Sequence, residues 1–463
     1  MDSASRIGEL RAQVRLTTER IIELLSQRLD LSREIGSAKL RSGLPVEDTA
    51  AEAALRHHIL RRCAELGIDG TRALRILNTL VDESVHLQTT QRTSTYTSHQ
   101  EILRLARELE GSGRRIIHLE IGEPDTPPPK SVIEEASRSL YQGYIHYSSA
   151  QGMKDLRESL AAYHKERSGV DIGPDQVLVT PGSRFALYLA VANVLRPGGG
   201  MVSFEPAWPA YRECTEAVGG RFSAVKTRLE DGWLFRAEEL QNCLEAGAEM
   251  LVVNNPCNPT GKVLRSKDLE VVLSEAKKKG LTILSDEVYS IFSPNPTPSI
   301  LGATDSNYIL ISSFSKAFRM TGFRIGYLIS SKELVARLTT MQSLLVTNVP
   351  EFVQRAALRA LDFQDDALRY ASVIRRRIKK AVEALNRLPV SFSEPDGGFY
   401  VFPRINVEGR GGDEFAARLL REKGVAVTPG TSFGDYPQFI RISVCQRSDL
   451  LMDGLAKMGE FLQ

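Results

Sequence analysis

The apolar residues of this chain follow one pattern before about residue 90 and another after it, and this change most constrains the fold. A heptad of apolar side chains across residues 3–41 predicts one long helix. Asp48 can cap a second helix that ends near Gly67, and a third helix is predicted over residues 71–88. The heptad positions are Ile7, Leu10, Val14, Ile21, Leu24, Leu31, Ile35 and Ala38. The first part is therefore predicted to be all-helical.

After residue 95, short apolar runs alternate with helical patterns, which predicts a mainly parallel sheet covered by helices. Further strands and a final helix after about residue 390 predict a smaller α+β lobe. Residues 89–95 are polar, rich in Thr and without an apolar stripe, so they are the predicted linker. The apolar runs that predict the strands of the main sheet lie at residues 116–121, 177–180, 201–204, 251–254, 282–285, 309–312 and 325–329.

Composition excludes several classes of protein. Apolar residues make up 42% of the chain and charged residues 25%, as in soluble proteins, and a net charge of +2 gives no field that would attract nucleic acid or an anionic membrane. Five scattered Cys without a C-x-x-C spacing argue against a disulfide framework or a zinc site. The first residues lack a signal-peptide pattern, and no apolar run reaches the length of about 18 residues that spans a bilayer. We therefore expect a cytoplasmic protein that holds no metal.

Polar side chains follow three of the predicted strands. Ser313 and Lys316 come at the end of one strand, Asp286 and Tyr289 follow a second, and Asn258 follows a third. Open α/β sheets bind ligands beyond the carboxyl ends of their strands, so these groups are expected in one crevice. They suit pyridoxal phosphate, which needs a lysine for covalent attachment and a carboxylate to keep its pyridine nitrogen protonated.

An anion site is predicted at residues 180–184, where a strand turns into a helix whose free N–H groups bind phosphate. Arg324 follows Lys316 by eight residues and can hold the same phosphate. Trp208 can stack on the cofactor ring, or it can belong to the core.

These residues resemble the class I aminotransferase family of fold type I over residues 95–463. The family's S-x-x-K-x-x-x-x-T-G-x-R string is matched by Ser313, Lys316, Thr321, Gly322 and Arg324. The other matching strings are N-P-T-G at 258–261, D-E-x-Y at 286–289, G-E-P-D at 122–125, Pro429-Gly430 with Phe433-Gly434, and Arg441 in I-R-I-S.

The resemblance implies roles. Lys316 would bind the cofactor and move a proton, Asp286 would pair with the pyridinium, and Arg441 would clamp the substrate α-carboxylate. The remaining implied positions are Asn258 and Tyr289 at the ring hydroxyl, Gly182, Ser183, Arg184, Ser313 and Arg324 at the phosphate, Trp208 on the ring, Gly122 at the substrate through its backbone, and Tyr147 at the phosphate of a partner subunit. Arg184 would alternatively meet the distal carboxylate of a dicarboxylic substrate.

The helical part has a charge on its apolar stripe. Arg28 continues the heptad, so it either reaches solvent or meets a buried anion. Lys39 lies about 16 Å further along the axis, a distance that two long side chains can span, whereas Arg11 lies about 26 Å from Arg28. Arg11 can join this site only from a second chain, in an antiparallel pair centred near Ile22. That arrangement implies an intertwined dimer with shared active sites.

Two polar pairs at i,i+4 spacing, Asp48 with Glu52 and Ser84 with Gln88, complete a site for a small dianion with a hydroxyl and an ether. This pattern resembles the all-helical chorismate mutase family across residues 5–88. One departure is Ala51, where the family usually has Arg. The implied roles place Arg11, Arg28, Asp48 and Ser84 on the substrate, Lys39 and Gln88 on its ether oxygen, and Glu52 on its ring hydroxyl.

Together the resemblances imply a two-enzyme fusion. A mutase domain would span residues 1–90 and an aminotransferase residues 91–463, with its large cofactor-binding domain at about 130–345 and a small domain formed by the N-terminal arm and about 346–463. The fusion would convert chorismate to prephenate, then transaminate prephenate or an aromatic 2-oxo acid with glutamate or aspartate.

Three alternatives stay open. The chain can be an aspartate aminotransferase with a non-catalytic helical dimerisation or regulatory arm, or a β-lyase or decarboxylase on the same fold. A transcription regulator would need a DNA-binding N-terminal domain, but the helices lack helix-turn-helix spacing. The expected partners are small-molecule substrates and a second copy of the chain, without nucleic acid or membrane.

Overall fold

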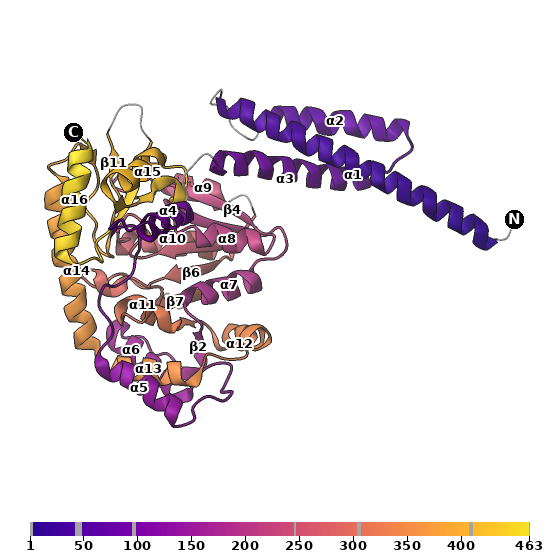
Figure 1. Cartoon of the computed structure of the whole chain (residues 1–463). Coiled ribbons are helices and arrows are strands. Elements are labelled where there is room, and N and C mark those ends of the chain that lie inside the picture. The colour runs from indigo at the N-terminus through magenta and orange to yellow at the C-terminus, as the bar shows by residue number, and fades with distance from the viewer. Residues whose placement is uncertain are drawn as a thin grey trace. The chain divides into compact units, whose positions relative to one another are not determined.

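In a computed structural model of the chain, residues 3–41, 49–94, 99–244, 247–302, 307–406 and 411–462 are described (Figure 1). The chain forms two compact units, Met1–Thr97 and Ser98–Gln463. None of the described helices is long and apolar enough to cross a membrane.

The described part of the first unit consists of helices α1 (Ser3–Arg41), α2 (Thr49–Glu65) and α3 (Gly70–Ser94). Helix α3 packs against both α1 and α2. The bounds of α1 confirm the long helix predicted from the heptad. The predicted linker is wrong in part, because residues 89–94 continue α3 without a Gly or Pro that would end the helix. The expected cap of α2, Asp48, lies outside the described residues.

The apolar heptad of α1 is largely exposed within one chain. Val14, Ile21 and Leu31 are 66%, 58% and 59% exposed. Among the side chains that the structure describes, those buried between α1 and α3 include two polar residues, Ser32 and Ser84. An exposed apolar stripe of this length is available for contact with another protein surface.

A seven-stranded sheet with the order β2-β8-β7-β6-β5-β3-β4 forms the centre of the second unit. Strand β8 runs antiparallel to both of its neighbours, and the other pairs are parallel, as predicted for a mainly parallel sheet. The strands are β2 (Val177–Thr180), β3 (Gly200–Glu205), β4 (Arg221–Lys226), β5 (Ala248–Asn254), β6 (Thr282–Asp286), β7 (Tyr308–Ser313) and β8 (Gly326–Ile329).

Helices cover both faces of this sheet. Successive strand residues enter different apolar cores: Leu178 and Val252 belong to one core, and Val179 and Val253 to the other. Strands buried on both faces have continuous apolar runs, which is why the sequence revealed them. The helices of this region are α5 (Lys130–Tyr141), α6 (Lys154–Ser168), α7 (Ser183–Val194), α8 (Ala210–Ala217), α9 (Ala237–Leu244), α10 (Ser266–Lys279), α11 (Phe314–Ala317), α12 (Lys332–Val346) and α13 (Glu351–Leu361).

A smaller α+β lobe is formed by segments from the start and from the end of this unit. The apolar run at residues 116–121 was expected in the main sheet, but its strand β1 (Ile117–His118) pairs in parallel with β12 (Val425–Ala426) of this lobe. Periodicity identifies a strand and not its partner, which here lies far away in the sequence. The other elements of the lobe are α4 (His99–Gly111), α14 (Gln364–Leu385), β9 (Val390–Ser391), β10 (Tyr400–Val401), β11 (Arg404–Ile405), α15 (Gly412–Lys423), β13 (Thr428–Pro429), β14 (Ile440–Ser443) and α16 (Ser448–Leu462).

Candidate active site

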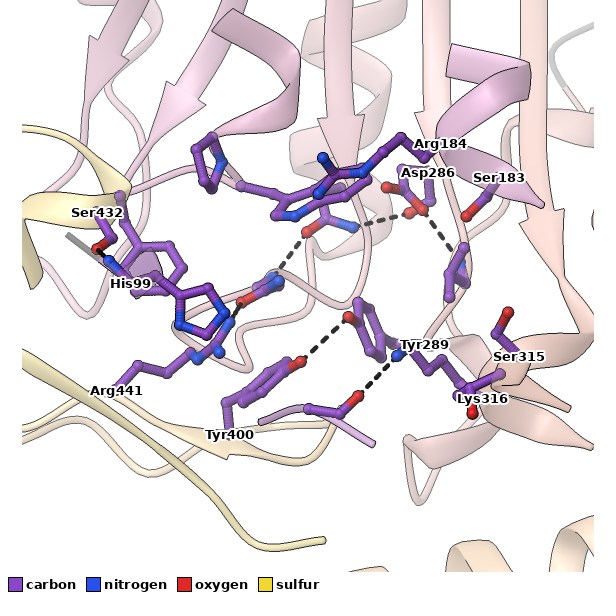
Figure 2. A pocket seen from close by; sticks show the side chains of 18 of the residues that line it. His99, Ser183, Arg184, Asp286, Tyr289, Ser315, Lys316, Tyr400, Ser432 and Arg441 are labelled. Atoms are coloured by element: carbon purple, nitrogen blue, oxygen red, sulfur yellow. Dashed lines mark hydrogen bonds between the residues drawn. The ribbon is translucent and has the colours of Figure 1, made fainter. Parts of the chain in front are cut away.

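The carboxyl ends of strands β2, β3, β4, β5, β6 and β7 lie at one edge of the central sheet. Strands β3, β5, β6 and β7 are parallel, and β2 shares their direction because β8 is antiparallel to both β7 and β2. A cavity of about 520 Å³ lies at this edge (Figure 2). The predicted residues that line it are Gly122, Ser183, Arg184, Trp208, Asn258, Asp286, Tyr289, Lys316, Arg324 and Arg441.

Lys316 lies in α11, directly after β7, and points into the cavity. Its Nζ donates a hydrogen bond to the carbonyl oxygen of Gly122 at 2.6 Å. Burial lowers the pKa of Lys316. A lowered pKa leaves more of the amine uncharged, which is the form that attacks an aldehyde. The group therefore suits covalent attachment of a carbonyl compound.

Asp286 ends β6 and is buried beside the cavity. Its Oδ2 accepts a hydrogen bond from the Tyr211 hydroxyl at 2.7 Å, and its Oδ1 accepts one from the Val288 N–H at 3.3 Å. Burial raises the pKa of Asp286 to about 6, although both hydrogen bonds oppose the shift. A cation placed against this carboxylate would offset the cost of burial. A protonated pyridine nitrogen is such a cation, so the residues present fit pyridoxal phosphate.

The phosphate end of the predicted site lies at the start of α7. Gly182 precedes the helix with φ of +85°, and a side chain there would lie 2.7 Å from the guanidinium of Arg324. Figure 2 shows the hydroxyls of Ser183 and Ser315 on the same side of the cavity as Lys316. Helix N–H groups, hydroxyls and a guanidinium at one place form a site for a phosphate.

Ser313 was predicted to face the phosphate, but the structure gives it another partner. Its Oγ accepts a hydrogen bond from the N–H of Ser315 at 2.9 Å, so Ser313 is the N-cap of α11. The Ser313 hydroxyl also lies 3.1 Å from the carbonyl oxygen of Ile325. Ser315 lines the cavity in its place.

Arg441 extends from β14 at the other side of the cavity and is buried. Its Nη1 donates to Asn258 Oδ1 at 2.9 Å, and its Nη2 donates to the carbonyl oxygen of Glu120 at 2.6 Å. No carboxylate pairs with it among the described residues. A buried guanidinium held only by neutral groups favours an incoming carboxylate.

Arg184 lies at the rim, with its guanidinium carbon 4.9 Å from the centre of the Trp208 ring and Nη1 3.7 Å from Glu213. Its side chain is 59% exposed. The Trp208 ring also packs edge-on against Tyr211, so it contributes to both cavity and core. This position leaves open both roles predicted for Arg184.

In the helical unit, Arg28 and Ser84 come together from α1 and α3. Arg28 Nη1 donates to Ser84 Oγ at 2.5 Å and to the carbonyl oxygen of Leu80 at 2.6 Å. Ser32, which the sequence did not reveal, places its hydroxyl 3.0 Å from that of Ser84. Arg11 is exposed on α1, and Lys39 is half-buried on the same helix. The side chains of Asp48, Ala51, Glu52 and Gln88 lie outside the described residues.

Comparison with known families accounts for both units. The family described as "Aminotransferase class I and II" matches residues 114–457, and "Chorismate mutase type II" matches residues 10–89. The chain belongs to the class I and II aminotransferases. It carries a chorismate mutase type II domain ahead of the aminotransferase.

Relatives support the assignment of the aminotransferase. Aspartate aminotransferase of Thermotoga maritima is 36% identical over 361 residues, which is 77% of this chain and 94% of the relative. The crystal structure of an aspartate aminotransferase from Thermotoga maritima superposes with a TM-score of 0.75 at 35% identity, over 78% of this chain and 96% of that one. An Aquifex aeolicus protein described as a probable aspartate/prephenate aminotransferase is 30% identical over 370 residues, 77% of this chain and 94% of the relative.

The loop at residues 122–125 is held by a buried ion pair. Asp125 accepts hydrogen bonds from both terminal nitrogens of Arg377, at 3.0 and 2.7 Å. The loop passes so close to Tyr400 that a side chain on Gly122 would overlap the phenol. This packing explains why the family string has glycine at its first position.

Several residues of the cavity lining were missed by the sequence analysis, and so was the buried Tyr211, which lies behind the lining and contacts Asp286. Tyr211 sits at an apolar position of α8, so only its contact with Asp286 reveals a role. Tyr147 lies outside the cavity lining and is 87% exposed, so its predicted role at a partner subunit stays a prediction. The missed residues of the lining include His99, Gln100, Asn254, Ser315, Tyr400, Ser432 and Phe433.

Proposed function

We propose that this protein is a bifunctional enzyme of aromatic amino acid biosynthesis. The mutase domain converts chorismate to prephenate, and the aminotransferase transfers an amino group from glutamate or aspartate to prephenate or an aromatic 2-oxo acid. The observation that carries the transamination half is the convergence of Lys316, Asp286 and Arg441 on one cavity (Figure 2).

Pyridoxal phosphate, when bound, supplies an electron sink for the negative charge that develops at the substrate Cα. Lys316 would hold the cofactor and afterwards carry the proton that leaves the substrate Cα. Asp286, supported by Tyr211, would keep the pyridine nitrogen protonated. Arg441 would bind the α-carboxylate through two parallel hydrogen bonds and thereby orient the Cα–H bond. The phosphate would lie among Gly182, Ser183, Ser315 and Arg324, and the ring would contact Trp208, Asn258 and Tyr289.

The mutase reaction needs no covalent step. Arg28, with its guanidinium held by Ser84 and the Leu80 carbonyl, would bind a substrate carboxylate at the centre of the helical unit. Lys39 would stabilise the charge that develops at the ether oxygen as the bond breaks. The site would hold chorismate in the shape that reacts, with Asp48, Glu52 and Gln88 as the further proposed contacts.

The proposal includes a homodimer. Arg11 lies about 26 Å from Arg28 along one helix, too far to share a small ligand with it. An antiparallel second copy would bring Arg11 to the site and cover exposed apolar residues such as Val14 and Ile21. Tyr147 would likewise reach the phosphate site of the partner.

The choice of substrate rests on the fusion and on the relatives. A mutase domain on the same chain would supply prephenate, and one relative is described as a probable aspartate/prephenate aminotransferase. Prephenate carries two carboxylates, and the cavity has two guanidinium groups outside the proposed phosphate site, Arg441 and Arg184. The second candidate is an aspartate aminotransferase with a non-catalytic helical arm, which the name of the Thermotoga relative favours.

The test is to incubate the protein with pyridoxal phosphate, chorismate and either glutamate or aspartate, and to follow the products by mass spectrometry. Formation of arogenate, the amination product of prephenate, would establish both activities. Prephenate alone would establish the mutase and reject prephenate as the amino acceptor. Unchanged chorismate with active aspartate transamination would favour the second candidate.

Two variants separate the halves in this assay. Lys316→Ala should abolish amination and leave prephenate formation intact, and Arg28→Ala should do the reverse when prephenate is supplied. A loss of both activities in either variant would contradict the assignment of one site to each unit.

A further inference from the structure

A second cavity, of about 390 Å³, lies between α14 and the loop 394–397 and shares no lining residue with the cofactor site. Its volume falls within the range of about 300–1,000 Å³ that is usual for small-molecule sites. Pro294 and the fully buried Phe292 also line it. The residues of α14 in the lining are Arg375, Ile378, Lys379, Val382, Glu383 and Asn386.

Helix α14 presents a charged row beside an apolar row to this cavity. Arg375, Lys379 and Glu383 follow one another at intervals of four residues, and Ile378 and Val382 lie four residues apart as well. Residues at this spacing share one face of a helix. A ligand of the cavity would therefore contact charged groups and apolar side chains at the same time.

The two cations of the charged row have no acidic partner in the part of the chain that the structure describes. Arg375 Nη2 donates to the neutral Ser372 Oγ at 2.7 Å. Lys379 forms no ion pair there either, although Glu383 lies one helical turn further on. A guanidinium and an ammonium group one turn apart can together bind a carboxylate.

The loop on the other side of the cavity adds negative charge and is already held in place. The Asp396 N–H donates to the carbonyl oxygen of Gly261 at 2.9 Å, and Asp396 Oδ2 lies 3.1 Å from Lys262 Nζ. Among the described residues, no cation pairs with the carboxylates of Glu394 and Glu383. These two acids can therefore accept hydrogen bonds from a cationic group of a ligand.

We propose that this cavity is a second binding site, which takes a small zwitterion with an apolar side chain, such as an α-amino acid. The carboxylate of the ligand would bind Arg375 and Lys379, its ammonium group would bind Glu394 or Glu383, and its side chain would lie against Phe292 and the apolar row of α14. A phosphate or a dicarboxylate fits less well, because its second negative charge would meet the acids of the lining. The inference does not depend on the proposed function.

The test is a titration of the holoenzyme with L-phenylalanine, followed by ligand-observed NMR. The enzyme is loaded with pyridoxamine phosphate, whose amine cannot condense with an amino acid. We expect a dissociation constant on the order of 1 mM, as for a small ligand with few contacts. Arg375→Ala combined with Lys379→Ala should weaken binding at least about tenfold. Arg376→Ala combined with Lys380→Ala is the matched control, since it removes two exposed cations of the same helix outside the lining, and it should leave binding unchanged.

Two analogues and one further variant complete the test. 3-Phenylpropionate has no ammonium group and 2-phenylethylamine has no carboxylate, so each should bind at least about fivefold more weakly than phenylalanine. The difference between the two double variants should persist on an Arg441→Ala background, which removes the carboxylate clamp of the cofactor site. No binding to the wild-type protein, equal losses in both double variants, equal binding of all three ligands, or a difference that disappears on the Arg441→Ala background would each overturn the inference.

Discussion

At the scale of single residues, Asp286 shows how one buried carboxylate can destabilise the cofactor-free fold and still favour binding of a cationic cofactor ring. It is buried, and its pKa is raised to about 6 by that burial. Tyr211 and the Val288 N–H oppose the shift and fix the two oxygens. The residual cost is what a pyridinium would relieve on binding.

This cost predicts a pH-dependent effect of Asp286→Asn on the cofactor-free protein. The folded-state pKa lies above the ordinary value of 3.8, so ionised Asp286 destabilises the fold above about pH 6 and less as pH falls towards 4. The variant should raise the free energy of unfolding by up to about 3 kcal/mol at about pH 8, and by less at about pH 5. Its thermal midpoint should rise accordingly. Thermal unfolding at both pH values checks this, and equal changes at both would contradict it.

Ser84 gives a residue-scale prediction for the mutase. Its hydroxyl accepts a hydrogen bond from Arg28 and donates one to the Leu80 carbonyl. Ser84→Ala would leave the guanidinium less firmly held, so kcat/KM for chorismate should fall about tenfold. Transamination by the same variant serves as the control and should not change. An unaltered mutase rate would show that Ser84 has no part in positioning Arg28.

At the scale of secondary-structure elements, β1 depends on contacts from elsewhere in the chain. It has two residues and pairs with β12, and its His118 links it to α4. His118 Nδ1 lies 2.8 Å from the buried Glu120, and Nε2 lies 3.0 Å from Glu110 of α4. The hydrogen bond with Glu120 is the largest cause that raises the pKa of His118 to about 9.

This contact predicts that His118→Asn destabilises the aminotransferase more at low pH than at high pH. Because the folded-state pKa is raised above the ordinary value of 6.5, the stabilisation is complete below that value and is lost as pH rises through about 9. The thermal midpoint of the variant should fall most at about pH 6 and least at about pH 10. The exposed-residue variant His58→Asn should leave the thermal midpoint unchanged at both pH values. An equal fall in the thermal midpoint of His118→Asn at both pH values would contradict the link between the stability and the protonation of His118.

At the scale of the whole molecule, the proposed homodimer depends on the surface of α1. Its heptad is exposed in one chain, although an apolar stripe of this kind is buried in stable helical assemblies. Each mutase site would need Arg11 from the second copy, whereas the residues of the proposed amino-transfer site, apart from Tyr147, come from one chain. The two activities should therefore respond differently to a change on α1.

Ile21→Glu tests this expectation. A carboxylate on the stripe would have to be desolvated if a second helix covered it, so mutase activity should fall by at least about tenfold. Transamination of aspartate should be retained, and light scattering should report weaker association at low protein concentration. Full mutase activity in this variant would contradict the intertwined arrangement.

The sequence by itself determined the features that depend on neighbours along the chain. The heptad determined the bounds of α1, and continuous apolar runs located most strands of the central sheet. Because strands of one direction end at one edge, the residues at and after their ends also predicted that Asn258, Asp286 and Lys316 share a cavity. The edge strand β4 was missed because its exposed residues interrupt the apolar run.

Only the tertiary structure decided which side chains meet across the fold. Ser315 rather than Ser313 faces the cavity because Ser313 caps α11. Tyr211 is a buried residue of α8, and only the tertiary structure places its hydroxyl on Asp286. His99 is the first residue of an amphipathic helix, and only the tertiary structure places it in the cavity lining. A repeat pattern reports which face of an element is buried. It does not report which residue from a distant segment lies against that face, because packing sets that contact.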